Sequence, residues 1–252
     1  MKILFIGNSF SVDACYYMTK IAEAGNFDLT TVNLVIGGCS LERHCSNIGM
    51  DDEEHSYAKS INTVPDGRIS LDAALAEDKY DIVSIQQASH YSGMWETYVP
   101  YLEELVSHVR KFQPDAKIAI HQTWAYEVDS SHSLFGNYEK NRHLMHARLC
   151  ECYERAAKVI GADIFVPCGN LIATLRDSWR FDPEKYGDRL SRDGFHLSMD
   201  YGRYAAGLMW CATLGMKNIM ENTFVPPLSG IRSDKIAFIK KTVAEIADCY
   251  RI

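Results

Sequence analysis

The chain has 252 residues, of which 47% are hydrophobic, and carries a formal net charge of −7 at pH 7. These values predict a globular protein of one large domain or two small ones, and they exclude a disordered chain. The sequence has no basic stripe and no apolar run of the roughly 20 residues that cross a bilayer, so neither nucleic acid nor membrane is an expected partner.

The first apolar segment, in "MKILFIGNSF", ends at Ile6 and is too short for the apolar region of a signal peptide. It is typical of a buried first strand, and the sequence favours a cytoplasmic location. A protein whose leader had been removed would give the same pattern. The eight cysteines form no CxxC pair and no zinc-ligand spacing, so we expect reduced, mostly buried thiols and no metal or other cofactor.

Short apolar segments alternate with segments of helical period. Buried strands are predicted at Lys2–Ile6, Leu29–Ile36, Asp81–Ile85, Lys117–His121 and Asp163–Val166. Helices are predicted at Ser11–Ala24, Leu102–Phe112, Tyr138–Ile160, Tyr201–Leu214 and Ile236–Tyr250. This alternation predicts one domain over residues 1–252, a three-layer α/β/α sandwich with a central parallel sheet. The polar, aperiodic stretch near residues 45–68 is predicted to be a surface excursion.

Ligands of an open parallel sheet bind beyond the carboxyl ends of its strands. Here small, amide and hydroxyl side chains follow four predicted strands, in "GNSFS", "GGCSLERH", "QQASHYSG" and "QTWAY". A serine after the first strand is a common helix cap, and it is also where a nucleophile would stand. Near the other end, "RDGFHLS" places Asp193 three residues before His196. That spacing lets a carboxylate orient an imidazole, although a surface ion pair is the simpler alternative.

Together, and in this order, these segments resemble the SGNH hydrolases, also called the GDSL esterase and lipase superfamily. The resemblance runs from Gly7 to His196 and is closest to a bacterial branch with "GNSF" and "DGFHLS" motifs. It implies a flavodoxin-like fold and a Ser-His-Asp triad that needs no metal. Ser9 matches the nucleophile, His196 the general base and Asp193 its orienting acid, while Asn8 stands where the superfamily name has Asp.

The resemblance also implies an oxyanion hole. Gly38 matches the glycine that contributes its N–H, and Gly37 is the alternative. The usual "GxND" stretch is absent, and "IQQASH" stands in its place. A "QGES"-like stretch in related carbohydrate acetylesterases aligns the side-chain donor with Gln86. Gln87 or His90 would replace it if the strand ended one residue differently.

Trp95, Trp124 and His90 are candidate substrate contacts, because they follow strands that end at the expected site. Aromatic rings there could stack on a sugar, or they could seal the core. The expected function is a serine esterase that removes a short acyl group from a carbohydrate through an acyl-enzyme. The alternatives are a non-catalytic module that binds a sugar or phosphate on the same fold, and an interaction protein with an inactive site.

Overall fold

A computed structural model describes residues 1–250, and its centre is a seven-stranded sheet in the order β4-β3-β2-β1-β5-β6-β7. The strands are β1 (Lys2–Gly7), β2 (Thr30–Val35), β3 (Tyr57–Ile61), β4 (Val64–Ile69), β5 (Ile82–Ile85), β6 (Lys117–His121) and β7 (Ile164–Val166). All five predicted strands are confirmed, and these five run parallel.

Two further strands come from the stretch near residues 45–68 that was predicted to be a surface excursion. β3 pairs antiparallel with β2, and β4 pairs antiparallel with β3. Part of this stretch therefore extends the sheet, which is mixed and not wholly parallel. β4 is exposed over most of its length, because it forms the edge of the sheet. A strand buried on neither face needs no apolar pattern, which explains why "VPDGRI" gave no strand signal.

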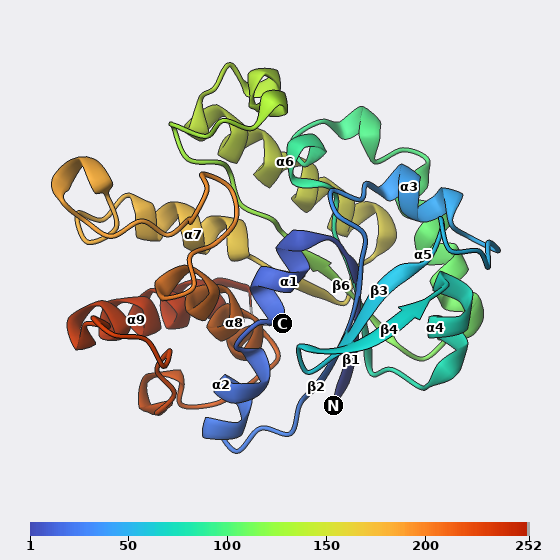
Figure 1. The fold of residues 1–252 in the computed structure, drawn as a ribbon, viewed down its shortest axis with the longest axis horizontal. Helices are drawn as coiled ribbons and strands as arrows, with labels where there is room; N and C mark the ends of the chain where they lie inside the picture. Colours follow the sequence, from blue (N-terminus) through green and yellow to red (C-terminus); the bar gives the residue numbers. More distant parts are fainter. Residues whose placement is uncertain (251–252) are drawn as a thin grey trace.

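Helices cover both faces of the sheet (Figure 1). One face carries α1 (Ser9–Cys15), α2 (Met18–Ala24), α7 (Cys168–Arg176), α8 (Tyr201–Thr213) and α9 (Ser233–Tyr250). The other carries α3 (Leu41–Ser46), α4 (Leu71–Glu77), α5 (Tyr101–Phe112) and α6 (Arg142–Ile160). Short 3-10 helices are η1 (Ser89–Tyr91), η2 (Trp95–Thr97), η3 (Ser133–Tyr138), η4 (Pro183–Lys185) and η5 (Ile219–Glu221). The three-layer α/β/α arrangement is confirmed.

The central strand β1 sets the position of the site. Its residues Ile3 to Ile6 are at most 1% exposed, because helices cover both of its faces. In the register of the sheet, Ile6 lies beside Leu34 of β2 and Ile85 of β5. The three strands therefore end together, and the loops that follow them meet at one edge of the sheet.

Within residues 1–250, no helix combines the length and apolarity needed to cross a bilayer. The eight cysteines all lie in this part of the chain and are unpaired. The buried ones are Cys15, Cys39, Cys152, Cys168 and Cys211.

Candidate active site

Ser9 is the first residue of α1 and follows β1 after a single residue. The residue between them, Asn8, caps the helix, because its Oδ1 accepts the N–H of Phe10 at 3.0 Å. Ser11, the other serine of the motif, is buried with its hydroxyl 2.7 Å from the carbonyl oxygen of Asn8 and 2.8 Å from Asn33 Oδ1. The capping position is therefore filled without Ser9, whose hydroxyl remains available.

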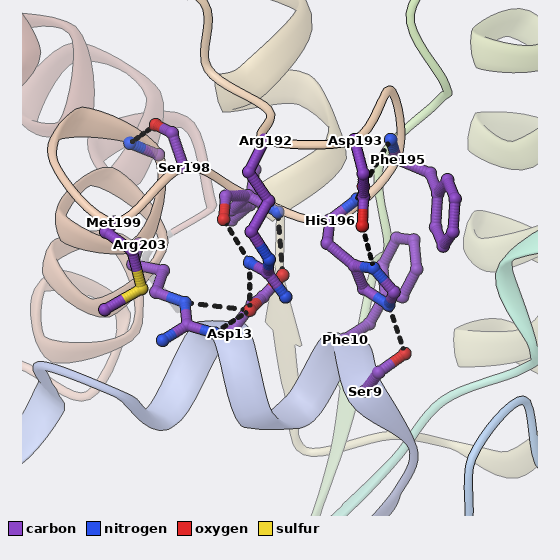
Figure 2. Close-up of polar contacts among 12 residues, drawn as sticks. Ser9, Phe10, Asp13, Arg192, Asp193, Phe195, His196, Ser198, Met199 and Arg203 are labelled. Atoms are coloured by element: carbon purple, nitrogen blue, oxygen red, sulfur yellow. Dashed lines mark hydrogen bonds and ion pairs between the residues drawn. The ribbon is translucent and has the colours of Figure 1, made fainter. Parts of the chain in front are cut away.

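The structure brings together Ser9, His196 and Asp193, which the sequence singled out from opposite ends of the chain (Figure 2). Ser9 Oγ lies 2.8 Å from His196 Nε2, and His196 Nδ1 lies 2.7 Å from Asp193 Oδ2. With the carboxylate on Nδ1, that nitrogen carries the ring proton. Nε2 is then free to accept the hydroxyl proton of Ser9.

Asp193 is held as a carboxylate. Its Oδ1 accepts the N–H groups of His196 at 2.8 Å and of Phe195 at 3.2 Å. Partial burial raises the pKa of Asp193, but the hydrogen bonds from the His196 ring and from these two N–H groups outweigh it, so the pKa lies below its ordinary value. The charge that orients His196 is therefore present at neutral pH.

The loop that carries Asp193 and His196 includes a glycine that no other residue can replace without strain. Gly194 has a φ of +88°, and a Cβ atom there would lie 2.9 Å from the Cα of Ser130. The close approach allows the carbonyl of Gly194 to accept the N–H of Glu127 at 2.8 Å. The "DGFH" turn is thereby docked on the loop that follows β6.

Trp124 presents no open face to a ligand, so it is corrected as a candidate substrate contact and is a ring that seals the core, whereas Trp95 is partly buried. Trp124 is 0% exposed and stacks on Phe10 with 4.4 Å between ring centroids. Its Nε1 donates to the carbonyl of Phe195 at 2.8 Å, so it supports the His196 loop from within the core. Trp95 packs against α6, where the guanidinium of Arg155 lies 3.9 Å from its ring centroid.

Gln86 lies in a buried polar network and not on an open surface. Asn8 Nδ2 donates to the carbonyl of Cys39 at 3.0 Å, which leaves Asn8 Oδ1 to accept from Gln86 Nε2 at 2.8 Å. Gln86 Oε1 lies 2.9 Å from Nδ1 of His121. Burial lowers the pKa of His121 to about 3, so this ring is neutral and donates from Nδ1. Gln86, 2% exposed, thus joins the ends of β1, β5 and β6.

Gln87 is also fully engaged. Its Oε1 accepts the N–H of Leu41 at 2.9 Å, and its Nε2 donates to the carbonyl of Thr97 at 2.8 Å. These bonds tie the end of β5 to α3 and η2. Both glutamine side chains are buried, at 2% and 1% exposed, and both amides donate to other parts of the protein.

His90 differs from both glutamines, because its ring nitrogens make no hydrogen bond within residues 1–250. The ring is half-buried and stacks on His132 with 5.6 Å between centroids. Burial, and then the proximity of His132, lower the pKa of His90 to about 4, so it is neutral at physiological pH. His132 in turn lies 5.1 Å from the ring of Phe195, which is the neighbour of His196. A row of rings therefore leads from His90 to the His196 loop.

Gly38 lies in the exposed turn after β2 and has a φ of +63°, which favours glycine. The bond from Asn8 Nδ2 to the carbonyl of Cys39 holds this turn against the end of β1. The N–H groups of Ser9 and Gly38 have no acceptor among the residues that the structure describes. They are two free donors on loops that meet at the same sheet edge.

Sequence reasoning missed several residues that shape the site: Asp13, Glu127, His132 and Phe195. Only Phe195 stands within a motif, and the others are recognisable only from their contacts.

Within residues 1–250, no group of three or more His, Cys, Asp or Glu side chains has the arrangement of a metal site. A hollow of about 1140 Å³ opens at the opposite edge of the sheet, where Met1, Asp81 and Lys117 line it.

The sequence matches, over residues 2–247, a family described as "Domain of unknown function (DUF4886)". A comparison with curated proteins finds no match. Among solved structures, a DUF4886 family protein from Bacteroides uniformis ATCC 8492 is 33% identical, with a TM-score of 0.87 over 97% of this chain and 93% of that one.

More distant structures share the fold. A candidate GDSL-like lipase from Parabacteroides merdae ATCC 43184 is 15% identical, with a TM-score of 0.57 over 86% of this chain and 96% of that one. A catalytic mutant of Axe2, an acetylxylan esterase from Geobacillus stearothermophilus, is 15% identical, with a TM-score of 0.55 over 86% of this chain and 94% of that one. The mixed α/β sheet between helical layers is therefore the fold of these hydrolases.

The hydrogen bonds of the Asn8 side chain predict how the stability of the variant Asn8→Asp depends on pH. This variant has aspartate at the position where the name GDSL has it. The carboxylate keeps the acceptor for Phe10 but cannot donate to the carbonyl of Cys39, so we expect a loss of about 1–3 kcal/mol in the free energy of unfolding at pH 8. Burial, together with the carbonyl of Cys39 that faces the second oxygen, should raise the pKa of the new carboxyl by more than the bonds from Phe10 and Gln86 lower it, so stability is lost as the pH rises.

Thermal unfolding of both proteins at pH 5 and pH 8 measures this dependence. The deficit should shrink at pH 5, where the protonated acid can donate again. Asn137→Asp, at an exposed position, is the matched control, with an expected change within about 0.5 kcal/mol. An equal loss at both pH values would contradict the donor role of Asn8.

Proposed function

The chain belongs to the DUF4886 family, and we propose that this member is a serine esterase of the SGNH hydrolase type. The observation that carries the proposal is the hydrogen-bonded line from Ser9 Oγ to His196 Nε2 (2.8 Å) and from His196 Nδ1 to Asp193 (2.7 Å). A serine hydroxyl becomes an effective nucleophile when a neighbouring base removes its proton and a third group orients that base.

The proposed reaction uses His196 twice. His196 Nε2 takes the proton of Ser9 as Oγ attacks the acyl carbonyl, and the Asp193 carboxylate stabilises the imidazolium that forms. The tetrahedral intermediate collapses as His196 gives the proton to the leaving alcohol, which leaves the acyl group on Ser9. Water, deprotonated by His196, then attacks the acyl-enzyme, and Ser9 recovers its proton.

The negative charge of the tetrahedral intermediate needs donors at the place where it develops. The N–H groups of Ser9 and Gly38 supply two, since neither has another acceptor within residues 1–250. We assign the side-chain donor to His90 instead of Gln86, because Gln86 is only 2% exposed and its amide already donates to Asn8 at 2.8 Å. A neutral imidazole donates one N–H without adding a charge, and the pKa of His90 near 4 keeps it neutral.

A short acyl group on a carbohydrate is the proposed substrate. His132 Nδ1 accepts the N–H of Leu134 at 3.3 Å, which places its ring proton on Nε2 as a donor for a hydroxyl. Phe195 is half-buried, with its ring centroid 4.2 Å from that of His196, and offers an apolar edge for a sugar face. The fold shared with an acetylxylan esterase is consistent with this substrate class.

The first test is hydrolysis of short-chain nitrophenyl esters and acetylated sugars by the wild type and by Ser9→Ala. We expect turnover in the wild type and a loss of about 10⁴-fold or more in the variant, because the nucleophile is gone. Ser11→Ala is the matched control, and its turnover per folded molecule should stay close to that of the wild type.

Two results would contradict the esterase. One is turnover in Ser9→Ala near that of the wild type, with matching circular dichroism. The other is a wild type that hydrolyses none of the esters yet binds a sugar or phosphate, which would establish the binding module instead.

A second test separates the oxyanion donors. His90→Ala should lower kcat by about 10²–10³-fold with a small change in KM, because the lost bond forms only in the transition state. Gln86→Ala should instead lower the melting temperature, because it breaks the network between Asn8 and His121. Steady-state kinetics and thermal unfolding of both variants, with Gln87→Ala alongside, measure this. A large kcat loss in Gln86→Ala and none in His90→Ala would return the donor to Gln86.

A further inference from the structure

Helix α1 presents two polar side chains toward the loop that carries Asp193 and His196 (Figure 2). Ser9 and Asp13 are four residues apart, about one helical turn, so both lie on one face of α1. Ser9 contacts His196 at 2.8 Å, and Asp13 contacts Leu197, the next residue of the loop. The same short helix therefore meets the loop at two neighbouring points.

Asp13 binds both flanks of the segment that contains Asp193 and His196. Its Oδ2 accepts the N–H of Leu197 at 2.7 Å, and its Oδ1 accepts from Arg192 Nη1 at 3.0 Å. Arg192 also donates its N–H to the carbonyl of His196 at 2.9 Å and its guanidinium to the carbonyl of Leu197. One carboxylate thus closes the base of the turn and fixes it to α1.

Burying the carboxylate of Asp13 costs free energy, and the positive charges of Arg192 and Arg203 compensate for it. The Asp13 side chain is 0% exposed. Arg203 of α8 donates to its Oδ1 from Nε at 2.8 Å, and Arg203 Nη2 lies 2.7 Å from the same atom. Apolar side chains of similar volume would stabilise such a site as well as a buried ion cluster does. Apolar side chains would not bind the N–H of Leu197 and the guanidinium of Arg192 in one fixed arrangement. The ion cluster therefore fixes the position of the loop relative to α1.

From these contacts we infer that Asp13, with Arg192, is a positioning residue that sets the distance between Ser9 and His196. The inference rests on the proposed function. Trp124 and Glu127 hold the far side of the loop, through the carbonyls of Phe195 and Gly194. Asp13 and Arg192 hold the side that faces α1. A displacement of about 1 Å between reacting groups can cost about 10²-fold in rate, so loss of this contact should be visible in turnover.

Arg192→Met is the variant that tests the inference, because it removes one cation and leaves Asp13 paired with Arg203. Arg192 is partly exposed, at 36% of its side chain, so the fold should tolerate the change. We expect kcat to fall by about 10-fold or more, with KM within about threefold of the wild type. Asp13→Asn should act in the same direction, and Arg192→Met carries the test if Asp13→Asn does not fold.

Arg189→Met is the matched control. Arg189 lies on the same segment, but it pairs with Asp129 at 2.6 Å on an exposed surface, and within residues 1–250 it makes no hydrogen bond or ion pair with α1. Its kcat should equal that of the wild type. If Arg192→Met also keeps wild-type kcat per folded molecule, the inference is overturned.

A spectroscopic readout separates this inference from the esterase proposal. In ¹⁵N-labelled protein, the Nε2 resonance of His196 should move in Arg192→Met, because the bond to Ser9 weakens. The Nδ1 proton bound to Asp193 should persist, because both residues belong to the same loop. Unchanged Nε2 signals would contradict the positioning role. A wild type without ester hydrolysis would contradict only the proposed function, and the ring signals would still decide this inference.

Discussion

The side-chain amide of Asn8 holds together the loops from which the site is built. Its oxygen accepts from Phe10 N–H and from Gln86, and its nitrogen donates to the carbonyl of Cys39. Parallel strands that end at one edge bring their loops close, but they do not fix them. With all three bonds in place, α1 must begin at Ser9, and the turn that contains Gly38 must lie beside it.

The other half of the site comes from the loop that carries Asp193 and His196. His196 is 187 residues away from Ser9 in the sequence, yet the two side chains are in contact. Its placement depends on bonds to the backbone of the loop and not on the two functional side chains alone. The indole of Trp124 and the N–H of Glu127 bind its carbonyls, and Asp13 binds one of its N–H groups. The chain's own hydrogen bonds therefore fix the position of this loop, and groups held in fixed positions are the condition for effective electrostatic stabilisation of a transition state.

The elements that the sequence predicted correctly are those whose burial leaves a pattern. β1 is covered on both faces and gives a continuous apolar run, whereas the exposed edge strand β4 gives none. Ser9, Asp193 and His196 could be singled out because each stands in a turn motif, in an order typical of one superfamily. Motif order carries no information on Asp13, whose partners Arg192 and Arg203 lie far along the chain.

The sequence did not predict which way a side chain points at the end of a strand, and so it did not predict which side chains face the candidate site. Gln86 and Gln87 are adjacent, and a shift of one residue reverses which of them faces a given side. The sequence left open whether Trp124 stacks on a sugar or seals the core, and in the folded chain Phe10 covers its face. His90 owes its neutral state to burial and to His132, which belongs to a different loop.

The central claim is that His196 activates Ser9, and covalent labelling with a fluorophosphonate tests it most directly. The probe reacts with an activated serine hydroxyl and not with one that only caps a helix. Intact mass and peptide mapping should find one adduct per chain, on Ser9 and not on Ser11, with His196→Ala unlabelled. A wild type that stays unlabelled while correctly folded, or an adduct on another residue, would contradict the account.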